Sequence, residues 1–198
     1  MILTSNKIKT EIQKGNIYCN PYNENNLAIN SIDVTLNKKI ATYIEMQYVY
    51  NRKAKKLELS PKITNEHKNV VLDAKKQNKV YFYEIPKDGI ILEPNILYLG
   101  STNEEIGSDI YVPMYEGRSS MARLGIQSHI SAGFGDLGFK SNWTLEIMVS
   151  HKVIVYPDMR IGQVYFIKPM GDIEKIYNGK YVKQGNTPTA SKSFEDFK

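Results

Sequence analysis

Apolar residues along most of this chain follow the short, alternating pattern of β-strands. The segments concerned are rich in β-branched and aromatic residues and are separated by proline, glycine and asparagine. They cover residues 31–37, 40–50, 80–85, 89–94, 96–102, 109–115, 143–149, 152–156 and 161–168. Their short, even spacing is typical of a barrel or sandwich, so the pattern predicts a mainly β fold.

The first residues show helical spacing instead. Ile8 and Ile12 lie one helical turn apart and share a face, Thr4 or Ser5 is suited to cap the N-terminus, and Gly15 is suited to end the helix. The pattern predicts a short N-terminal helix whose apolar side packs on the β-structure.

The length of 198 residues fits a single domain over residues 1–198. Residues 51–79 are rich in lysine and asparagine, and we interpret them as a variable, partly exposed excursion without chemistry. Residues 170–198 are polar and turn-rich, so they need a surface or a ligand to hold them down. No segment reaches the length of uninterrupted apolar sequence that a membrane span needs, and the N-terminus lacks a secretory signal. We therefore expect a cytoplasmic protein.

The charge pattern favours a small anionic partner over nucleic acid. The net charge is +5, and four of the 26 basic residues are arginines. Three arginines, Arg118, Arg123 and Arg160, lie close together in sequence, whereas the lysines are scattered as on a solvated surface. Guanidinium groups bind phosphate in a bidentate manner, so the clustered arginines point to a phosphate-bearing ligand.

A long segment between two predicted strands, residues 115–147, concentrates glycine, serine, arginine and acidic residues. Within it, GRSSMAR (117–123) places two hydroxyls and two guanidinium groups at a turn that leads into a helix. This arrangement suits phosphate binding. A capped helix with surface arginines explains the heptad equally well, so the pattern alone leaves both interpretations open.

The predicted strand WTLEIMV (143–149) carries a carboxylate in its middle. Alternation places its odd-numbered residues, which are all apolar, on one face, and Thr144, Glu146 and Met148 on the other. A glutamate among apolar neighbours is a candidate general acid or base. The alternative is a solvent-facing glutamate on a half-exposed strand.

The successive motifs resemble those of the dCTP deaminase and dUTPase superfamily. They are EGRSSMARLGIQSH (116–129), SAGFGDLGF (131–139), WTLEI (143–147) and YPDMRIGQVYF (156–166), and the likeness extends to MIL (1–3), SIDVTLN (31–37), LYLGSTNEE (97–105) and YNGKYVKQG (177–185). Trimeric dUTPases carry an apolar residue where this chain has Glu146, whereas the deaminases carry glutamate. The chain therefore resembles the dCTP deaminase family over most of its length apart from residues 51–79.

The resemblance implies a dUTPase-type fold, which is a distorted β-barrel or jelly roll with few helices, and a homotrimer with active sites between subunits. It implies the deamination of dCTP to dUTP and ammonia, which feeds thymidylate synthesis, with dTTP as a possible inhibitor. Glu146 would shuttle protons for the water that attacks C4, with Ser119 and Arg123 orienting the reacting groups.

The same resemblance implies a set of substrate-binding residues. Arg118 and Ser120 would hold phosphates, the Ala132 carbonyl would accept from the amino group or the water, and Asp136 would meet the 3′-hydroxyl. The C-terminal segment 170–198 would close over the triphosphate. The remaining implied contacts are His129 at the base and Tyr177, Lys180 and Gln184 at the triphosphate.

Two further functions stay open. A bifunctional member of the family would also remove pyrophosphate and release dUMP; Asp136 fits both types, Ala122 favours the deaminase alone, and the YNGKY segment resembles bifunctional members. A dUTPase-like protein that senses nucleotides without catalysis is the other alternative. The complete set of Ser119, Arg123 and Glu146 argues against it, because a pure binder needs no general base.

The cysteine and histidine content argues against a zinc deaminase. Such enzymes need a histidine and two cysteines, or three cysteines, and Cys19 is the only cysteine here. We interpret Cys19 as a small buried apolar residue. His67, His129 and His151 lack ligand spacing. The resemblance implies a zinc-free mechanism in which Mg²⁺ enters with the triphosphate.

Two positions depart from the family pattern in a way that bears on backbone geometry. Ser141 and Asp158 stand where the family often has glycine. Both are therefore predicted to adopt backbone conformations that glycine takes at lower cost.

Overall fold

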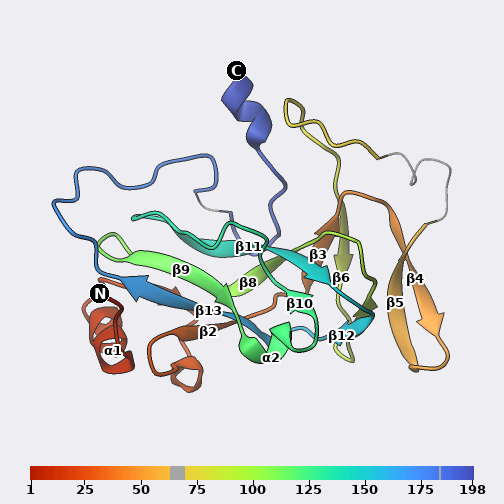
Figure 1. Ribbon diagram of the computed structural model, residues 1–198, viewed down its shortest axis with the longest axis horizontal. Coiled ribbons are helices and arrows are strands. Elements are labelled where there is room, and N and C mark those ends of the chain that lie inside the picture. Colours follow the sequence, from red (N-terminus) through yellow and green to blue (C-terminus); the bar gives the residue numbers. More distant parts are fainter. Residues whose placement is uncertain (63–69, 183) are drawn as a thin grey trace.

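The computed structural model describes residues 1–62, 70–182 and 184–198. Its strands form three sheets with a few short helices around them (Figure 1). This confirms the mainly β prediction. Within the described residues the sheets are distorted and stay separate, so they do not close into a single barrel.

The largest sheet has the order β10-β11-β8-β3-β6, and β1 also pairs with β8. Its strands are β1 (Tyr18–Asn20), β3 (Lys39–Thr42), β6 (Tyr81–Glu84), β8 (Tyr98–Gly107), β10 (Ile126–Gln127) and β11 (Lys140–Val149). The second sheet runs β12-β7-β5-β4 and the third runs β2-β13-β9. Their strands are β4 (Met46–Asn51), β5 (Lys56–Pro61), β7 (Ile90–Leu92), β12 (Val153–Val155), β2 (Ile32–Thr35), β9 (Val112–Gly117) and β13 (Arg160–Ile167). Neighbouring strands are antiparallel except for β5 and β7.

Each segment that alternation predicted as a strand contains one, and the differences concern breaks and short strands. Residues 40–50 form two strands, β3 and β4, in different sheets. The range 51–79 also contains regular structure, because β5 runs through it and buries Leu59 completely. The two-residue strand β10 has too little sequence to show alternation, and it exists through its pairing with β11.

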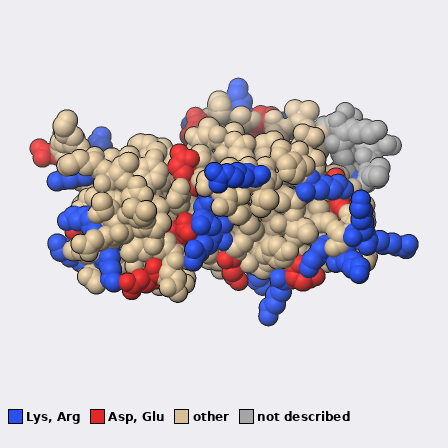
Figure 2. All heavy atoms as spheres, turned by 60° about the horizontal axis from the view of Figure 1, so that its bottom comes forward, with Lys and Arg blue, Asp and Glu red and all other residues tan. Residues whose placement is uncertain are grey.

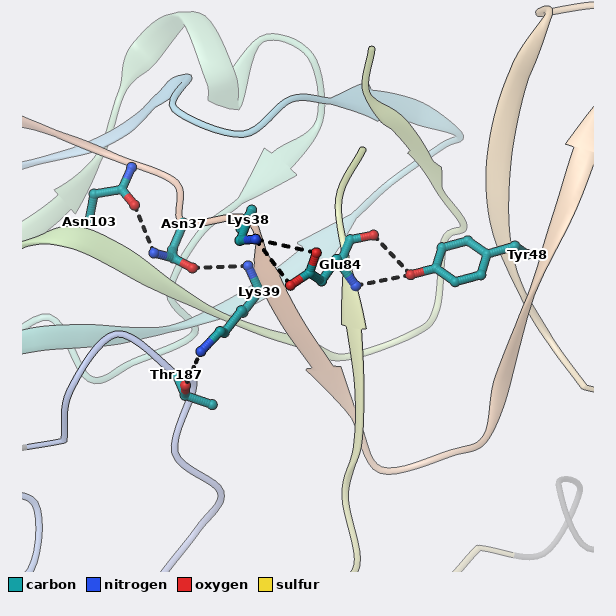
Figure 3. Close-up of polar contacts among 7 residues, drawn as sticks. All are labelled: Asn37, Lys38, Lys39, Tyr48, Glu84, Asn103 and Thr187. Carbon is teal, nitrogen blue, oxygen red and sulfur yellow. Dashed lines mark hydrogen bonds and ion pairs between the residues drawn. The ribbon is translucent and has the colours of Figure 1, made fainter. Parts of the chain in front are cut away.

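A tyrosine joins the edges of two sheets. The hydroxyl of Tyr48 on β4 accepts from the Glu84 backbone N–H and donates to the Glu84 carbonyl on β6, at 2.9 Å in both cases (Figure 3). These bonds satisfy backbone groups at the edge strand β6, and unpaired edge groups are otherwise open to pairing with other chains.

The predicted N-terminal helix is α1 (Ser5–Gln13), with Thr4 as its N-cap residue. Ile8 is fully buried and Ile12 packs against the core, as the spacing predicted. Gly15 follows the helix with a φ of +74°, a conformation that glycine adopts without steric cost.

The predictions for Ser141 and Asp158 have different outcomes. Asp158 has a φ of +63°, in the left-handed region that favours glycine, and its carboxylate accepts from the Asn103 side-chain amide at 2.8 Å. Ser141 lies in β11 with no positive φ, so the prediction for that residue is wrong. A serine at 141 instead offers its hydroxyl to the C-terminal segment.

Cys19 packs against the core, although it is partly rather than fully buried, and desolvation raises the pKa of its thiol to about 12. At neutral pH it is therefore a protonated, unreactive side chain.

Helix α1 also buries a carboxylate. Glu11 is only 2% exposed, and its side chain contacts Lys7 at 2.9 Å, Lys14 at 3.6 Å and the Asn16 amide at 2.6 Å. The hydrogen bond from Lys7, followed by that from Asn16, lowers the pKa of Glu11 to about 2. The ionised form therefore ties α1 to the turn that follows it.

We predict that Glu11→Gln destabilises the protein in a pH-dependent way. The pKa of Glu11 in the folded state lies below the unfolded value of roughly 4.3, so its charge stabilises the fold above about pH 4 and this contribution is lost as the pH falls towards 2. Each kcal/mol lost lowers Tm by roughly 2–4 °C. Thermal melts should show a lower Tm than the wild type at pH 7 and no difference near pH 2. The exposed Glu174→Gln serves as a control that leaves Tm unchanged, and a gap that persists at low pH would contradict the assignment.

Candidate functional site

A cavity of about 620 Å³ opens between β11, the loop after β10 and the C-terminal segment. This volume lies within the range of small-molecule sites. It brings together residues that the sequence predicted as one site and that come from three separate parts of the chain. They are Ala132, Asp136, Glu146, Tyr177, Lys180 and Gln184.

Strand β11 places Glu146 at this cavity. The odd-numbered residues from Trp143 to Val149 are buried and the even-numbered ones are half-buried, as alternation predicted. Pairing with β8, in which Glu146 lies opposite Leu99, fixes the register. The Glu146 carboxylate accepts from the backbone N–H of Ile130 at 3.3 Å. The carboxylate is therefore held at the wall of the cavity, as a residue that exchanges protons with a bound ligand requires.

The loop at residues 131–139 lies close against β9 because it contains glycines. A Cβ on Gly133 would lie 2.5 Å from the Tyr115 carbonyl oxygen, and one on Gly135 would lie 2.5 Å from the Trp143 ring. Two backbone bonds fix the loop: Tyr115 N–H donates to the Gly133 carbonyl at 2.7 Å, and Gly135 N–H donates to the Pro113 carbonyl at 2.9 Å. This close approach brings Ala132 and the exposed Asp136 to the cavity.

The GRSS turn forms a short helix, α2 (Ser119–Ala122), with Arg118 in an extended conformation before it. The helix start predicted from GRSSMAR is thus present. The four residues predicted to act from this turn do not line the cavity of the same chain. They are Arg118, Ser119, Ser120 and Arg123, of which the last three are exposed.

Asp33, which the sequence motifs did not indicate, holds two arginines. Asp33 on β2 is 6% exposed, and its carboxylate contacts Arg118 Nε at 3.2 Å and Arg160 Nη1 at 3.5 Å. A buried carboxylate needs such partners. The sequence does contain a signal for this residue, because SIDVTLN places an acidic residue among apolar neighbours. Asp33 therefore positions Arg118 at the start of α2.

His129 lies beside the cavity rather than in its wall. Its Nε2 is 3.4 Å from Glu116, its ring meets Tyr115 edge-on, and its Nδ1 is buried without a hydrogen-bond partner among the described residues. His151 is next to Ser150, whose hydroxyl is 3.1 Å from its Nδ1. The third histidine, His67, lies outside the described residues.

The C-terminal segment is fixed to the largest sheet by side-chain hydrogen bonds. Thr144 on β11 donates to Gln184 Oε1 at 2.6 Å and accepts from the Thr189 backbone N–H at 3.1 Å. The Ser141 hydroxyl accepts from the Gln184 N–H at 3.0 Å. From β3, Lys39 Nζ donates to the Thr187 hydroxyl at 3.0 Å (Figure 3). The protein surface therefore supplies what this polar segment needs to be ordered.

The part of the segment before these contacts faces the cavity. Tyr177 N–H donates to the Leu137 carbonyl at 2.6 Å, and the Tyr177 hydroxyl accepts from the Tyr181 N–H at 3.0 Å. Lys180 lies between them, and the hydrogen bond from its ammonium to Asp196 raises its pKa. Lys180 is the only cationic residue lining the cavity among the described residues.

On the face that Figure 2 shows, basic residues are not gathered into one stripe. Lys and Arg side chains are spread over this face with Asp and Glu between them (Figure 2).

In the part of the chain that the structure describes, no helix has the length and apolar composition of a membrane span.

The described residues that line the cavity include two carboxylates, one lysine and several aromatic rings, which indicates a site for a small polar ligand. The chain belongs to the dCTP deaminase-like family, whose model matches residues 2–168.

Individual relatives agree with this membership. A protein named "dCTP deaminase, dUMP-forming" from Hathewaya histolytica is 39% identical over 198 residues, covering 100% of this chain and 99% of the relative. One of the same name from Clostridium acetobutylicum is 40% identical over 181 residues, covering 91% and 90%. A solved 2′-deoxycytidine 5′-triphosphate deaminase from Agrobacterium tumefaciens shares the fold with a TM-score of 0.58 at 14% identity, over 85% of this chain and 48% of that chain. This chain thus spans about half the length of that solved chain.

We predict that Thr144→Val loosens the C-terminal segment. The change removes a hydroxyl that makes two hydrogen bonds to it, each worth about 1 kcal/mol. Amide exchange at Thr189, followed by NMR, should become faster by roughly fivefold to tenfold. Thr144→Ser retains the hydroxyl and should preserve most of the protection, so unchanged protection in Thr144→Val would contradict this role.

Proposed function

We propose that this protein deaminates dCTP and also removes pyrophosphate, so that it releases dUMP, ammonia and pyrophosphate. The observation that carries the proposal is Glu146, a carboxylate fixed by β11 in the wall of a cavity of nucleotide size. The names of full-length relatives support dUMP as the product over dUTP. The proposal therefore takes the bifunctional alternative in place of dUTP as the main product.

The first hydrolysis takes place at C4 of cytosine. A water molecule attacks C4, N3 gains a proton, and the amino group leaves as ammonia after it too is protonated. Glu146 takes one proton from the attacking water and passes it to N3. It then takes the proton of the new C4 hydroxyl and passes it to the amino group, so one carboxylate serves both as base and as acid. The hydrogen bond from Ile130 N–H supports this role by holding the carboxylate in place. The carbonyl of Ala132, on the same cavity, accepts from the amino group or the water.

The triphosphate is held by the C-terminal segment. Lys180 supplies a positive charge at the cavity, and Tyr177 and Gln184 lie beside it. Asp136 accepts a hydrogen bond from the 3′-hydroxyl. Mg²⁺, held by the triphosphate rather than by side chains, would neutralise part of the phosphate charge. In the second hydrolysis a water molecule attacks the α-phosphorus, the bond from that phosphorus to the oxygen shared with the β-phosphate breaks, and pyrophosphate leaves, so that dUMP remains.

The position of α2 supports a homotrimer with shared sites. Ser119, Ser120 and Arg123 are exposed and do not line the cavity that contains Glu146. An active site that needs both sets of residues is therefore completed by α2 of a second copy. Asp33 keeps Arg118 directed at the start of that helix.

Incubation with dCTP and Mg²⁺, followed by ion-exchange separation of the products, tests the reaction. We expect dUMP and pyrophosphate in equal amounts, together with ammonia. Accumulation of dUTP, with no pyrophosphate, would restore the monofunctional deaminase. Nucleotide binding with no turnover at all would favour the sensing protein.

Mixing two inactive variants tests the shared site. Glu146→Gln should lower turnover by roughly 10²- to 10⁴-fold while nucleotide binding is largely kept, and Arg123→Met should also lose turnover. If Glu146 and Arg123 of one site come from different subunits, random trimers of the two variants regain intact sites, about one quarter of the total. Ammonia release should then recover in the mixture after dissociation and reassembly. A mixture as inactive as its components would place both residues in one chain's site.

A further inference from the structure

An ion pair joins the last described helix to a residue that lines the cavity. Helix η3 (Ser193–Phe197) is a short 3-10 helix, and its Asp196 lies 2.5 Å from the ammonium of Lys180. The Lys180 side chain is 24% exposed, and that of Asp196 is 66% exposed. A carboxylate on the solvent side thus holds the only cation that lines the cavity among the described residues.

Two more contacts keep η3 next to Lys180. The Lys192 backbone N–H donates to the Tyr181 hydroxyl at 2.9 Å, and Lys192 Nζ donates to the Lys180 carbonyl at 2.6 Å. The chain before η3 is fixed in turn by the contact of Ser191 N–H with the Tyr43 hydroxyl at 3.1 Å. These hydrogen bonds therefore keep Asp196 next to the ammonium of Lys180.

Carboxylate and phosphate oxygens compete for the same N–H donors of a lysine. On the basis of the proposed function, we propose that Asp196 is a positioning residue. It holds Lys180 in the ligand-free protein and releases Lys180 when the triphosphate binds. A partly exposed ion pair stabilises a protein only slightly, so the exchange costs little. A triphosphate carries more negative charge than the monophosphate product, so it displaces Asp196 more readily, and Asp196 recaptures Lys180 as the product leaves.

A purely structural role for Asp196 makes the opposite prediction. If the ion pair served only to keep the C-terminal segment in place over the cavity, its loss would loosen that segment and weaken nucleotide binding. Competition with phosphate instead means that loss of Asp196 strengthens binding. The sign of the change in KM therefore separates the two roles.

The test compares Asp196→Asn with the wild type in steady-state deamination of dCTP. We expect KM to fall by roughly twofold to fivefold, in keeping with the small energy of such a pair, and kcat not to rise. Glu195→Gln removes the same charge one residue away and should change KM less. Asp196→Glu restores the carboxylate and should return KM towards the wild-type value. An unchanged or higher KM in Asp196→Asn would overturn the proposal.

Calorimetry with inorganic tripolyphosphate separates this inference from the proposed reaction, because it requires no turnover. Asp196→Asn should bind the probe more tightly than the wild type, and this difference should vanish when both carry Lys180→Gln. A difference that persists without Lys180, or no binding by either protein, would refute the exchange. A wild type that binds the probe in this way yet releases no ammonia from dCTP would refute the deaminase function alone.

Discussion

The antiparallel pairing of β11 with β8 is the constraint on which both the core and the cavity depend. On one side of β11, Trp143, Leu145 and Ile147 enter the core. On the other side, Thr144 and Glu146 face the cavity. Because side chains alternate with a period of two, a slip of one residue would bury Glu146 and expose the apolar side chains. The hydrophobic energy of the core therefore holds the carboxylate in position.

Strand β11 also fixes the C-terminal segment. The strand that carries Glu146 therefore holds the segment that lies over the cavity as well. Thr144, two residues before Glu146, is hydrogen-bonded to Gln184 and Thr189. Residues between these anchors and β13 carry Tyr177 and Lys180 to the cavity. The C-terminal segment is thus fixed at one end by β11, the strand that carries Glu146. The polar composition of this segment predicts little burial. The segment is ordered nevertheless, because side chains on β3, β8 and β11 form hydrogen bonds with it.

Alternation predicted the strands well because it depends on local sequence, and the face of β11 that carries Glu146 was predicted correctly. What it missed depends on partners far away in the sequence. Strand β10 is two residues long and owes its existence to β11. The role of Asp33 becomes apparent only when the fold brings Arg118 and Arg160 next to its carboxylate. The contact between Lys180 and Asp196 likewise joins two polar residues in a segment without periodicity.

The division of the predicted site follows from the position of α2. Among the described residues the cavity is lined by two carboxylates, the Ala132 loop and Lys180, and not by the arginines or serines of the GRSS turn. Exposed hydroxyls contribute little to folding, so the two exposed serines beside the guanidinium that Asp33 holds add little to the stability of a single chain. Holding Arg118 with Asp33 costs the burial of a charge. That cost is understandable if the turn presents a preorganised anion-binding surface to another molecule, as the proposed shared site requires.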